Sequence, residues 1–491
     1  MNNFLIIIHF KETSAERKVN TIEHHFTKAE DISMTDNVIS RNPTNGEIIA
    51  TYRLQSPAQL QSALQESANA FAEWRYTAMP QRVKVLRQLS EQIRQRQDEL
   101  ATMATLEMGK PIAQARAEVL KCANLCDWYA EHGPAILADK PTLVENQQAW
   151  QSFRPLGVIL AVMPWNFPYW QVLRGAVSML LAGNTYVLKH APSVMGSANL
   201  MTSLFDATDL PKGGFTVINV DNDGVSAAIK DPRIAAVAVT GSVRAGGAIA
   251  AQAGAVLKKT VLELGGADPF IVLADADLDA AVASAVTGRY QNTGQVCMAA
   301  KRFIIEESVA EAFEARFSAA VRALKIGDPL DEETYIGPMA RYDLRDELDN
   351  QVQQTIREGA RLVLGGHKID GVGNYYAPTI LADVTPAMTA FQQEIFGPVA
   401  AITVARDAQH ALELANDSEF GLSATVWSGN EAVANELAEK LETGAVFING
   451  NGASDPRVAI GGVKKSGYGR ELSSFGVHEF CNIQTVWKNR R

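Results

Sequence analysis

Val158-Ile-Leu-Ala-Val162 sets the architecture of this chain, because five consecutive apolar residues after a glycine are typical of a strand that is buried on both faces. A helical pattern follows from Pro168 to Leu181, and a second apolar strand runs from Thr185 to Lys189. Short apolar strands that alternate with helices predict a parallel sheet with helices on both sides.

The alternation continues toward the carboxyl end of the chain. It predicts strands at Phe215–Val220, Ile234–Val239 and Thr260–Leu264, and helices from Ser193, near Val225 and at Ala245–Ala255. A second series of strands and helices runs from Pro269 to about Gly450. The sequence therefore predicts an α/β protein with two such series.

Two segments before this alternation have different patterns. Residues 57–132 have apolar side chains at helical spacing. Residues 141–154 are mostly polar and alternate as in an exposed pair of strands, so we expect Trp150 and Phe153 on the surface.

The amino-terminal residues 1–33 have neither pattern, and we expect them to be loosely ordered. A domain-like sequence begins at Met34. We hypothesise that translation starts there; an intact mass of the natively expressed protein that retains Met1 would contradict this.

The composition limits the class of protein. The chain has 491 residues, of which 47% are hydrophobic and 20% charged, which is typical of a globular protein with two or three domains. Its net charge of −10 argues against nucleic acid or an anionic membrane as a partner. Four cysteines are too few for a disulfide framework, so we expect a cytoplasmic location. Cys122 and Cys126 lie four residues apart, but no His or Cys follows at metal-ligand spacing, so no metal site is expected.

Cys297 lies in the stretch Tyr290-Gln-Asn-Thr-Gly-Gln-Val-Cys-Met-Ala-Ala-Lys301, between a glycine and an apolar run. A thiol at such a turn can reach a substrate, and its thiolate form is a nucleophile. The alternative is a small buried residue, since free cysteine is among the most buried residue types. Gly294 and Gln295 favour a loop and therefore the reactive interpretation.

Glu263 lies within the apolar run Thr260-Val-Leu-Glu-Leu264. An unpaired carboxylate in such a strand has a raised pKa, which makes it a candidate general base near neutral pH. The alternative is a structural salt bridge to Lys258 or Lys259.

Three further positions follow strands of the first series. Asn166 precedes a helix, and it is either the cap of that helix or an amide donor to a developing oxyanion. Lys189 ends a strand, at the edge where open α/β folds bind ligands, although a solvated lysine would look the same. Thr240-Gly-Ser242 opens a helix whose N-terminus can receive a pyrophosphate, but such a start is more often only a turn.

Six motifs occur together in the following order: Pro164-Trp-Asn-Phe-Pro168, Thr240-Gly-Ser242, Leu262-Glu-Leu-Gly-Gly266, Gly294-Gln-Val-Cys297, Glu394-Ile-Phe-Gly-Pro398 and Ser466-Gly-Tyr-Gly-Arg-Glu471. In this combination the chain resembles the aldehyde dehydrogenase superfamily from about Asn42 to its carboxyl end. More closely, it is similar to the short bacterial succinate-semialdehyde dehydrogenases, through Tyr169-Trp-Gln-Val-Leu-Arg174, Leu188-Lys-His-Ala-Pro192 and Glu479-Phe-Cys-Asn-Ile-Gln-Thr485.

The resemblance implies an aldehyde dehydrogenase-like α/β fold, with two Rossmann-like parallel-sheet domains and a small β oligomerisation flap. The nucleotide-binding domain would comprise residues 34–137 and 156–261, and the catalytic domain residues 262–465. The flap would comprise residues 138–155 and 466–491. The resemblance also implies a homodimer or a homotetramer.

It further implies a role for each motif residue. Cys297 would attack the aldehyde carbonyl, and the Asn166 amide would hold the oxyanion together with the Cys297 backbone N–H. Glu263 would activate water to hydrolyse the thioester. Lys189 and Glu394 would bind the two ribose groups of the cofactor. The other residues of the cofactor cleft would be Trp165, Gly241, Ser242 and Phe396.

The resemblance favours NAD as the cofactor, with NADP accepted. Many NAD-preferring members have a glutamate three residues after the strand-end lysine, where this chain has Pro192. Proline neither repels a 2′-phosphate nor donates a hydrogen bond to one.

The substrate prediction depends on Arg174, which lies near the same helix face as Trp170 and Asn166. Its apolar neighbours leave the guanidinium without an anion, and a substrate carboxylate would supply one. The alternative is an internal ion pair to an acidic residue that the sequence does not identify. Ser454 would donate a second hydrogen bond. Some succinate-semialdehyde enzymes have another arginine six residues before the cysteine, where this chain has Gln291.

Together these features predict the NAD(P)-dependent oxidation of succinic semialdehyde to succinate, the last oxidative step of 4-aminobutyrate breakdown. Glu263 favours hydrolysis over transfer of the acyl group to coenzyme A. Two alternatives stay open. The first is the same chemistry on glutaric semialdehyde or on a broad range of aliphatic aldehydes, and the second is a binding or structural protein that keeps the fold without turnover.

Overall fold

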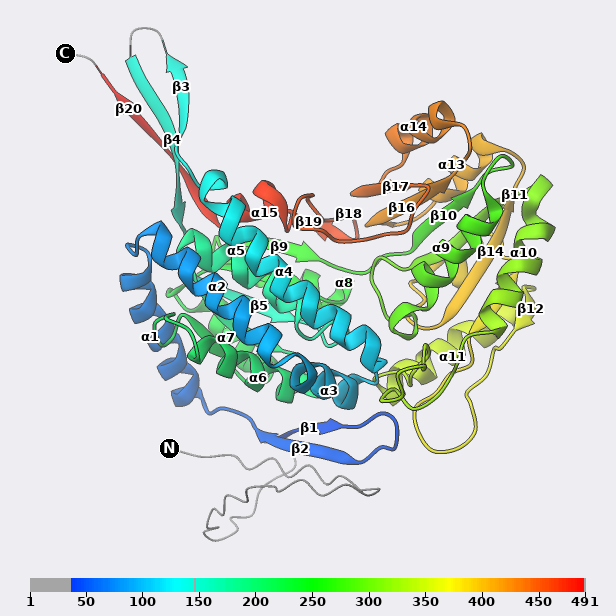
Figure 1. The fold of residues 1–491 in the computed structure, drawn as a ribbon, viewed down its shortest axis with the longest axis horizontal. Helices are drawn as coiled ribbons and strands as arrows, with labels where there is room; N and C mark the ends of the chain where they lie inside the picture. Colours follow the sequence, from blue (N-terminus) through cyan, green and yellow to red (C-terminus); the bar gives the residue numbers. More distant parts are fainter. Residues whose placement is uncertain (1–36, 145–146, 490–491) are drawn as a thin grey trace.

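The computed structural model describes residues 37–144 and 147–489 of the chain. Figure 1 shows two α/β bodies side by side and an arm of three strands that projects from one of them. The expected extension, residues 1–33, and the hypothesised start at Met34 lie outside the described residues.

The first body is built on a six-stranded sheet, which confirms the first series of strands and helices. The strand order is β19-β9-β8-β5-β6-β7. All neighbours in this sheet pair in parallel except β19 and β9, which are antiparallel. The strands are β5 (Val158–Met163), β6 (Thr185–His190), β7 (Phe215–Val217), β8 (Ile234–Thr240), β9 (Lys259–Glu263) and β19 (Gly467–Tyr468).

Alternate residues of β5 pack against different helix layers, because successive side chains of a strand point to opposite faces of the sheet. Ile159 and Ala161 belong to one core cluster, and Val158 and Leu160 belong to another. The first cluster includes residues of α2 (Met79–Gln95), α3 (Gln97–Met108), α4 (Ile112–Ile136), α5 (Trp170–Ala182) and α6 (Met195–Asp206). The second includes residues of α1 (Pro57–Trp74), α7 (Asn222–Lys230) and α8 (Val243–Ala255).

The second body has a seven-stranded sheet in the order β12-β13-β14-β11-β10-β16-β17. Only the pair of β12 and β13 is antiparallel within this sheet. Its strands are β10 (Asp268–Val272), β11 (Ala300–Glu306), β12 (Arg361–Leu364), β13 (Thr379–Ala382), β14 (Val399–Ala405), β16 (Ser423–Trp427) and β17 (Ala445–Ile448). Its helices are α9 (Leu278–Tyr290), α10 (Glu307–Arg322), α11 (Tyr342–Arg357), α12 (Thr389–Gln392), α13 (Ala408–Asn416) and α14 (Glu431–Lys440).

Short elements connect and flank the two sheets. β1 (Asn37–Arg41) and β2 (Ile48–Arg53) form an antiparallel hairpin, and β15 (Phe420–Gly421) pairs with β18 (Val463–Lys464). The 3-10 helices η2 (Pro192–Val194) and η3 (Gln291–Gly294) precede α6 and β11 respectively. The turn at η3 leads to Cys297.

The arm is an antiparallel sheet of β3 (Lys140–Val144), β4 (Gln147–Pro155) and β20 (Cys481–Lys488), with β4 in the middle. The expected surface position of Phe153 is wrong. This side chain is buried, because it packs on Ala182 and Cys481 and stacks on His478 with ring centroids 4.0 Å apart.

The expected boundary of the flap also differs from the structure, because residues 466–480 do not join the three-stranded arm. Gly467 of β19 pairs with Glu263 of β9 in the six-stranded sheet. α15 (Ser473–Glu479) follows and packs on α5 and α4. This course brings the motif that ends at Glu471 close to the carboxyl end of β9.

A buried ion pair fixes the start of α5, the helix that follows β5. Lys110 Nζ pairs with Glu118 Oε2 of α4, and the two side chains are almost fully buried. Glu118 Oε1 also accepts hydrogen bonds at 2.9 Å from the backbone N–H groups of Tyr169 and Trp170. The carboxylate therefore satisfies donors at the N-terminus of α5 and complements the helix dipole.

Removal of this carboxylate should destabilise the protein. Glu118→Ala leaves the Lys110 charge buried without its partner, so we expect the free energy of unfolding to fall by about 3–5 kcal/mol. Glu131→Ala changes an exposed residue of the same helix and should cost less than about 0.5 kcal/mol. Urea denaturation of both variants measures the difference, and an equally small effect in both would contradict the assigned role of Glu118.

Candidate active site

The carboxyl ends of four neighbouring strands meet at one edge of the six-stranded sheet, because β6, β5, β8 and β9 are parallel. Trp165 and Asn166 follow β5, and Lys189 lies near the end of β6. Gly241 follows β8, and Glu263 ends β9. The sheet topology thus brings together residues that are far apart in the sequence.

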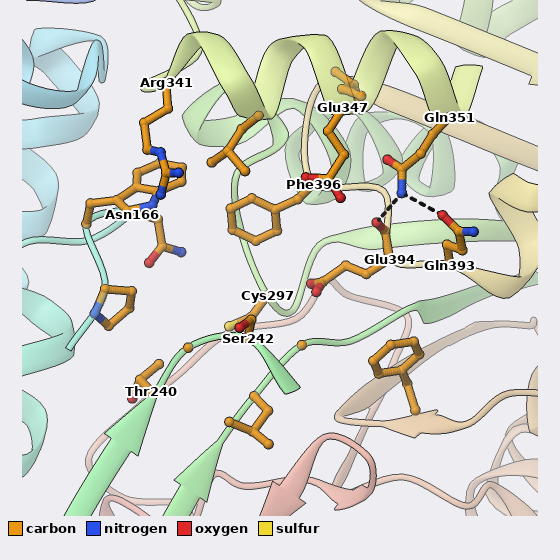
Figure 2. Close-up of a pocket in the computed structure, with 18 of the residues that line it drawn as sticks. Asn166, Thr240, Ser242, Cys297, Arg341, Glu347, Gln351, Gln393, Glu394 and Phe396 are labelled. Atoms are coloured by element: carbon orange, nitrogen blue, oxygen red, sulfur yellow. Dashed lines mark hydrogen bonds between the residues drawn. The ribbon is translucent and has the colours of Figure 1, made fainter. Parts of the chain in front are cut away.

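A pocket of about 580 Å³ opens at this edge, and residues of both bodies line it. Figure 2 shows Cys297 in this pocket, with Asn166 and Glu394 on either side of it in the view. The predicted site residues that line the pocket are Trp165, Asn166, Gly241, Ser242, Cys297, Glu394 and Phe396. The predicted site residues outside its lining are Glu263, Lys189, Pro192, Trp170, Arg174 and Ser454.

A strained turn leads to Cys297. Asn292 and Thr293 both have a φ of 54°, in the left-handed region that is costly for a β-branched residue. Gly294 has a φ of 72°, and a Cβ atom there would lie 2.2 Å from the carbonyl oxygen of Gly397. The glycine before Cys297 is therefore required by both its backbone conformation and its close neighbour.

This turn is hydrogen-bonded directly to Asn166. Asn292 Nδ2 donates to the Asn166 carbonyl oxygen at 2.8 Å, and Asn166 Nδ2 donates to the Gln295 carbonyl oxygen at 3.1 Å. The cap position of α5 belongs to Tyr169, so the Asn166 side chain is not a helix cap. Because a primary amide has two N–H donors, one donor of Asn166 remains for a substrate oxygen.

Burial and the neighbouring cations have opposite effects on the pKa of the Cys297 thiol. Burial raises its pKa to about 11, whereas the cations Arg174 and Lys301 oppose this shift. Cys297 is only partly buried, and it borders the pocket. The thiolate that a nucleophilic reaction needs therefore depends on these two cations.

Glu263 is buried at the end of β9, and this burial raises the pKa of its carboxyl well above the usual range. It is not paired with the neighbouring lysines. Lys259 pairs with Glu479 at 2.6 Å, and Lys258 donates to the Ile229 carbonyl oxygen at 2.6 Å. Glu263 Oε1 has no hydrogen-bond partner in the described part of the chain. In its ionised form, a carboxylate with a raised pKa is a stronger base toward water than an ordinary carboxylate.

The structure corrects the expected state of Arg174. Its Nε forms an ion pair with Glu471, and its Nη2 lies 3.8 Å from Glu263 Oε2. Nη2 also donates to Thr240 Oγ1 at 3.3 Å. The internal ion pair that the sequence left open is thus present, and the guanidinium does not lack an anion. Glu471 reaches this position because β19 pairs with β9.

Glu394 lies at the pocket and is held by two groups. Its Oε1 accepts a hydrogen bond from the Gly266 N–H at 3.1 Å and pairs with Lys301 Nζ at 3.2 Å. Lys301 also donates to the Cys297 carbonyl oxygen. A Cβ atom at Gly265 would lie 2.2 Å from Glu394 Oε2, so the glycine pair of the Leu-Glu-Leu-Gly-Gly motif makes room for this carboxylate.

The neighbouring edge fits a dinucleotide. The rings of Trp165 and Phe396 meet edge to face with centroids 5.9 Å apart, and both border the pocket. A Cβ atom at Gly241 would have no neighbour within 4 Å, so there is space before α8, which Ser242 caps. Lys189 lies on β6, the strand next to β5 on this edge.

Trp170 and Ser454 meet at Lys121, a residue of α4. Lys121 Nζ donates to Ser454 Oγ at 2.7 Å and lies 4.0 Å from the centroid of the Trp170 ring. Two of the three predicted substrate residues therefore surround a lysine that the sequence did not single out.

Four polar residues of the site were missed in the sequence. Asn292 and Lys301 lie within the quoted stretch around Cys297, and Glu471 ends a quoted motif, so the polar side chains of these motifs were an available signal. Lys121 has no comparable signal, because a lysine on a helix is usually solvated.

Some other kinds of site are absent from the described residues. No group of three or more His, Cys, Asp or Glu side chains within residues 37–144 and 147–489 could hold a metal ion. In the same ranges, no helix combines the length and the apolar character that a membrane span requires.

Comparisons with known proteins agree with one another. The sequence profile described as the aldehyde dehydrogenase family matches residues 30–486. The chain is 64% identical to the succinate semialdehyde dehydrogenase NAD(P)+ Sad of Escherichia coli K12, over 94% of this chain and 99% of the relative. It is 46% identical to a probable NADP(+) succinate-semialdehyde dehydrogenase of Synechocystis, over 91% and 98% of the two chains.

Solved structures give the same result. The succinic semialdehyde dehydrogenase of Streptococcus pyogenes, solved in complex with NADP+, has a TM-score of 0.90 and 37% sequence identity, over 92% of this chain and 100% of that chain. The structure of Gox0499 has a TM-score of 0.91 and 42% identity, over 92% of this chain and 99% of that chain. With 37% and 42% identity, the chain is similar to these two proteins in sequence as well as in fold.

The raised pKa of Cys297 should appear in its alkylation. Iodoacetamide should inactivate the cofactor-free enzyme slowly at neutral pH, and the rate should rise about tenfold per pH unit up to about pH 10, because only the thiolate reacts. Peptide mass spectrometry assigns the modified residue, and Cys297→Ala is the control. A rate that reaches its plateau below about pH 8 would mean a lowered pKa and would contradict the assigned environment.

Proposed function

The chain belongs to the aldehyde dehydrogenase family, and on this premise we propose that it oxidises succinic semialdehyde to succinate with a nicotinamide dinucleotide as the hydride acceptor. The chemistry is supported by Cys297 and Asn166, which line one pocket, and by the buried Glu263 at the end of β9, whose charge acts on the Cys297 thiol. The choice of aldehyde is supported by the high identity to the Escherichia coli relative and its name.

The first half of the reaction forms a bond to sulfur. The Cys297 thiolate attacks the aldehyde carbon, and the carbonyl oxygen becomes an oxyanion. The free N–H of the Asn166 amide and the backbone N–H of Cys297 stabilise this charge. A nicotinamide bound in the cleft would supply the hydride acceptor, and the carbon that loses the hydride would become the thioester carbonyl.

The second half of the reaction hydrolyses the thioester. Glu263 accepts a proton from water, the water oxygen attacks the thioester carbon, and the carbon–sulfur bond breaks to release the acid and the Cys297 thiolate. The raised pKa of Glu263 suits this role, because a carboxylate with an ordinary pKa is a weaker base. Arg174 stays close to Glu263 and limits this shift of the pKa.

The cofactor would bind at the edge formed by β5, β6 and β8. Trp165, Gly241, Ser242 and Phe396 would line its cleft, and Lys189 and Glu394 would hold the two ribose groups. NAD is the proposed preference with NADP accepted, because Pro192 neither repels nor binds a 2′-phosphate. A kcat/KM for NADP equal to or above that for NAD would contradict this preference.

The proposed assembly is a homodimer or a homotetramer formed through the arm. β3, β4 and β20 project from the body (Figure 1). Leu143, Ile483 and Trp487, which belong to these strands, have exposed side chains. The proposed location is the cytoplasm, which is supported by four free cysteines in the structure. A monomer in sedimentation velocity, or secretion of the native protein, would contradict these proposals.

The aldehyde preference tests the proposed function. Succinic semialdehyde and butanal have the same four-carbon aldehyde and differ in the carboxylate, so the ratio of their kcat/KM values measures its recognition. We expect a ratio on the order of a hundred, since charge-assisted hydrogen bonds to a carboxylate contribute about 2–3 kcal/mol. A ratio near one, or a higher value for glutaric semialdehyde than for succinic semialdehyde, would contradict this substrate.

A further inference from the structure

We propose that Lys121 and Ser454 bind the carboxylate of the substrate. This inference depends on the proposed oxidation of a semialdehyde acid and names the residues that recognise the acid group. It replaces the role that the sequence assigned to Arg174, whose charge is already balanced by Glu471.

The first argument is the free hydrogen-bonding capacity at Lys121. An ammonium group has three N–H donors, and in the described part of the chain Lys121 uses one of them, toward Ser454 Oγ. The Ser454 hydroxyl accepts this bond, so its own hydrogen remains for another acceptor. The Trp170 ring covers one side of the ammonium group and keeps it away from water. Two adjacent donors in a partly desolvated site match a carboxylate.

The second argument is the balance of charges around Lys121. The two carboxylates whose charges raise the pKa of Lys121, Glu118 and Asp455, are both paired with other cations. Glu118 pairs with Lys110, and Asp455 pairs with Arg457 Nε at 2.7 Å. Lys121 itself forms no ion pair within residues 37–144 and 147–489. A substrate carboxylate would supply the missing anion, as expected for a half-buried cation.

The third argument is the position of this group relative to the reacting thiol. The loop that carries Ser454 packs against Met298, the residue after Cys297, since a Cβ atom at Gly452 would lie 3.2 Å from the Met298 carbonyl oxygen. Trp170 is the first residue of α5, and Asn166 lies four residues before it in the bend that leads to this helix. In succinic semialdehyde the two carbonyl carbons are three bonds of about 1.5 Å apart, so both ends of the substrate need partners in one small region.

The state of the lysine agrees with an anionic ligand. Burial lowers the pKa of Lys121 to about 8, and Arg174 acts in the same direction, whereas Cys122, Glu118 and Asp455 oppose it. A bound carboxylate favours the charged form and would raise this pKa.

The test compares matched variants with succinic semialdehyde and butanal. Lys121→Met keeps the length of the side chain and removes its charge, Lys121→Arg keeps the charge, and Ser454→Ala removes the hydroxyl. Lys84→Met, which changes an exposed lysine of α2, is the control. Each variant is checked by its kcat/KM for butanal and by its thermal unfolding, so a loss of folding is recognised.

We expect Lys121→Met to lower the ratio of kcat/KM for succinic semialdehyde to kcat/KM for butanal about a hundredfold. Ser454→Ala should lower the same ratio about tenfold, and Lys121→Arg should restore part of it. If Lys121→Met does not fold, the Ser454→Ala ratio decides. A wild-type ratio in Lys121→Met or, where that variant does not fold, in Ser454→Ala would overturn the proposal, and so would a ratio that collapses only in Arg174→Met. A wild-type ratio near one would instead refute the proposed substrate.

Discussion

Two reciprocal hydrogen bonds join the two bodies at the point where the chemistry takes place. Asn166 follows β5 of the first sheet, and Asn292 and Gln295 lie in the turn before β11 of the second. This turn holds two residues in the left-handed region, and such strain persists only where surrounding contacts fix it. The position of Cys297 therefore depends on both sheets at once, and an error in either would misplace the nucleophile relative to the amide that serves it.

The Arg174 cation acts on both the nucleophile Cys297 and the base Glu263. Arg174 is bound by Glu471, lies close to Glu263 and lowers the pKa of Cys297. Burial acts on Glu263 and Cys297 in the same direction and raises both pKa values. Burial thus keeps Glu263 basic enough to take a proton, while the Arg174 charge opposes the rise in the pKa of both Glu263 and Cys297. The charge of Arg174 is balanced because β19 pairs with β9, which brings Glu471 to the guanidinium.

Much of the fold was predictable, because short strands that are buried on both faces have continuous apolar sequences. The strand at Val158 and the helix after it are where the local pattern placed them, within two or three residues. Asn166, Ser242, Cys297 and Glu394, which line the pocket, were identified through their motifs. The sequence could not identify Glu471 as the partner of Arg174, because that contact joins residues that are far apart in the sequence. The burial of Phe153 was missed for a similar reason, since helix α15 supplies the ring that covers it.

The role of Lys121 could not be predicted from the sequence either. Its sequence neighbours belong to an ordinary helix, and its significance comes only from the loop and the ring that meet it in space. A pattern read along one element cannot show that the carboxylates nearby are already paired. The charge balance of a buried region is a property of the assembled fold.

The central claim is that Cys297 carries the acyl group that Glu263 then releases by hydrolysis. The most direct measurement is the mass of the Cys297 peptide after Glu263→Gln protein is mixed with succinic semialdehyde and NAD and rapidly quenched in acid. The predicted result is a succinyl group on Cys297 that disappears much faster in the wild type. Steady turnover of Glu263→Gln at the wild-type rate with no adduct on Cys297 would contradict the account.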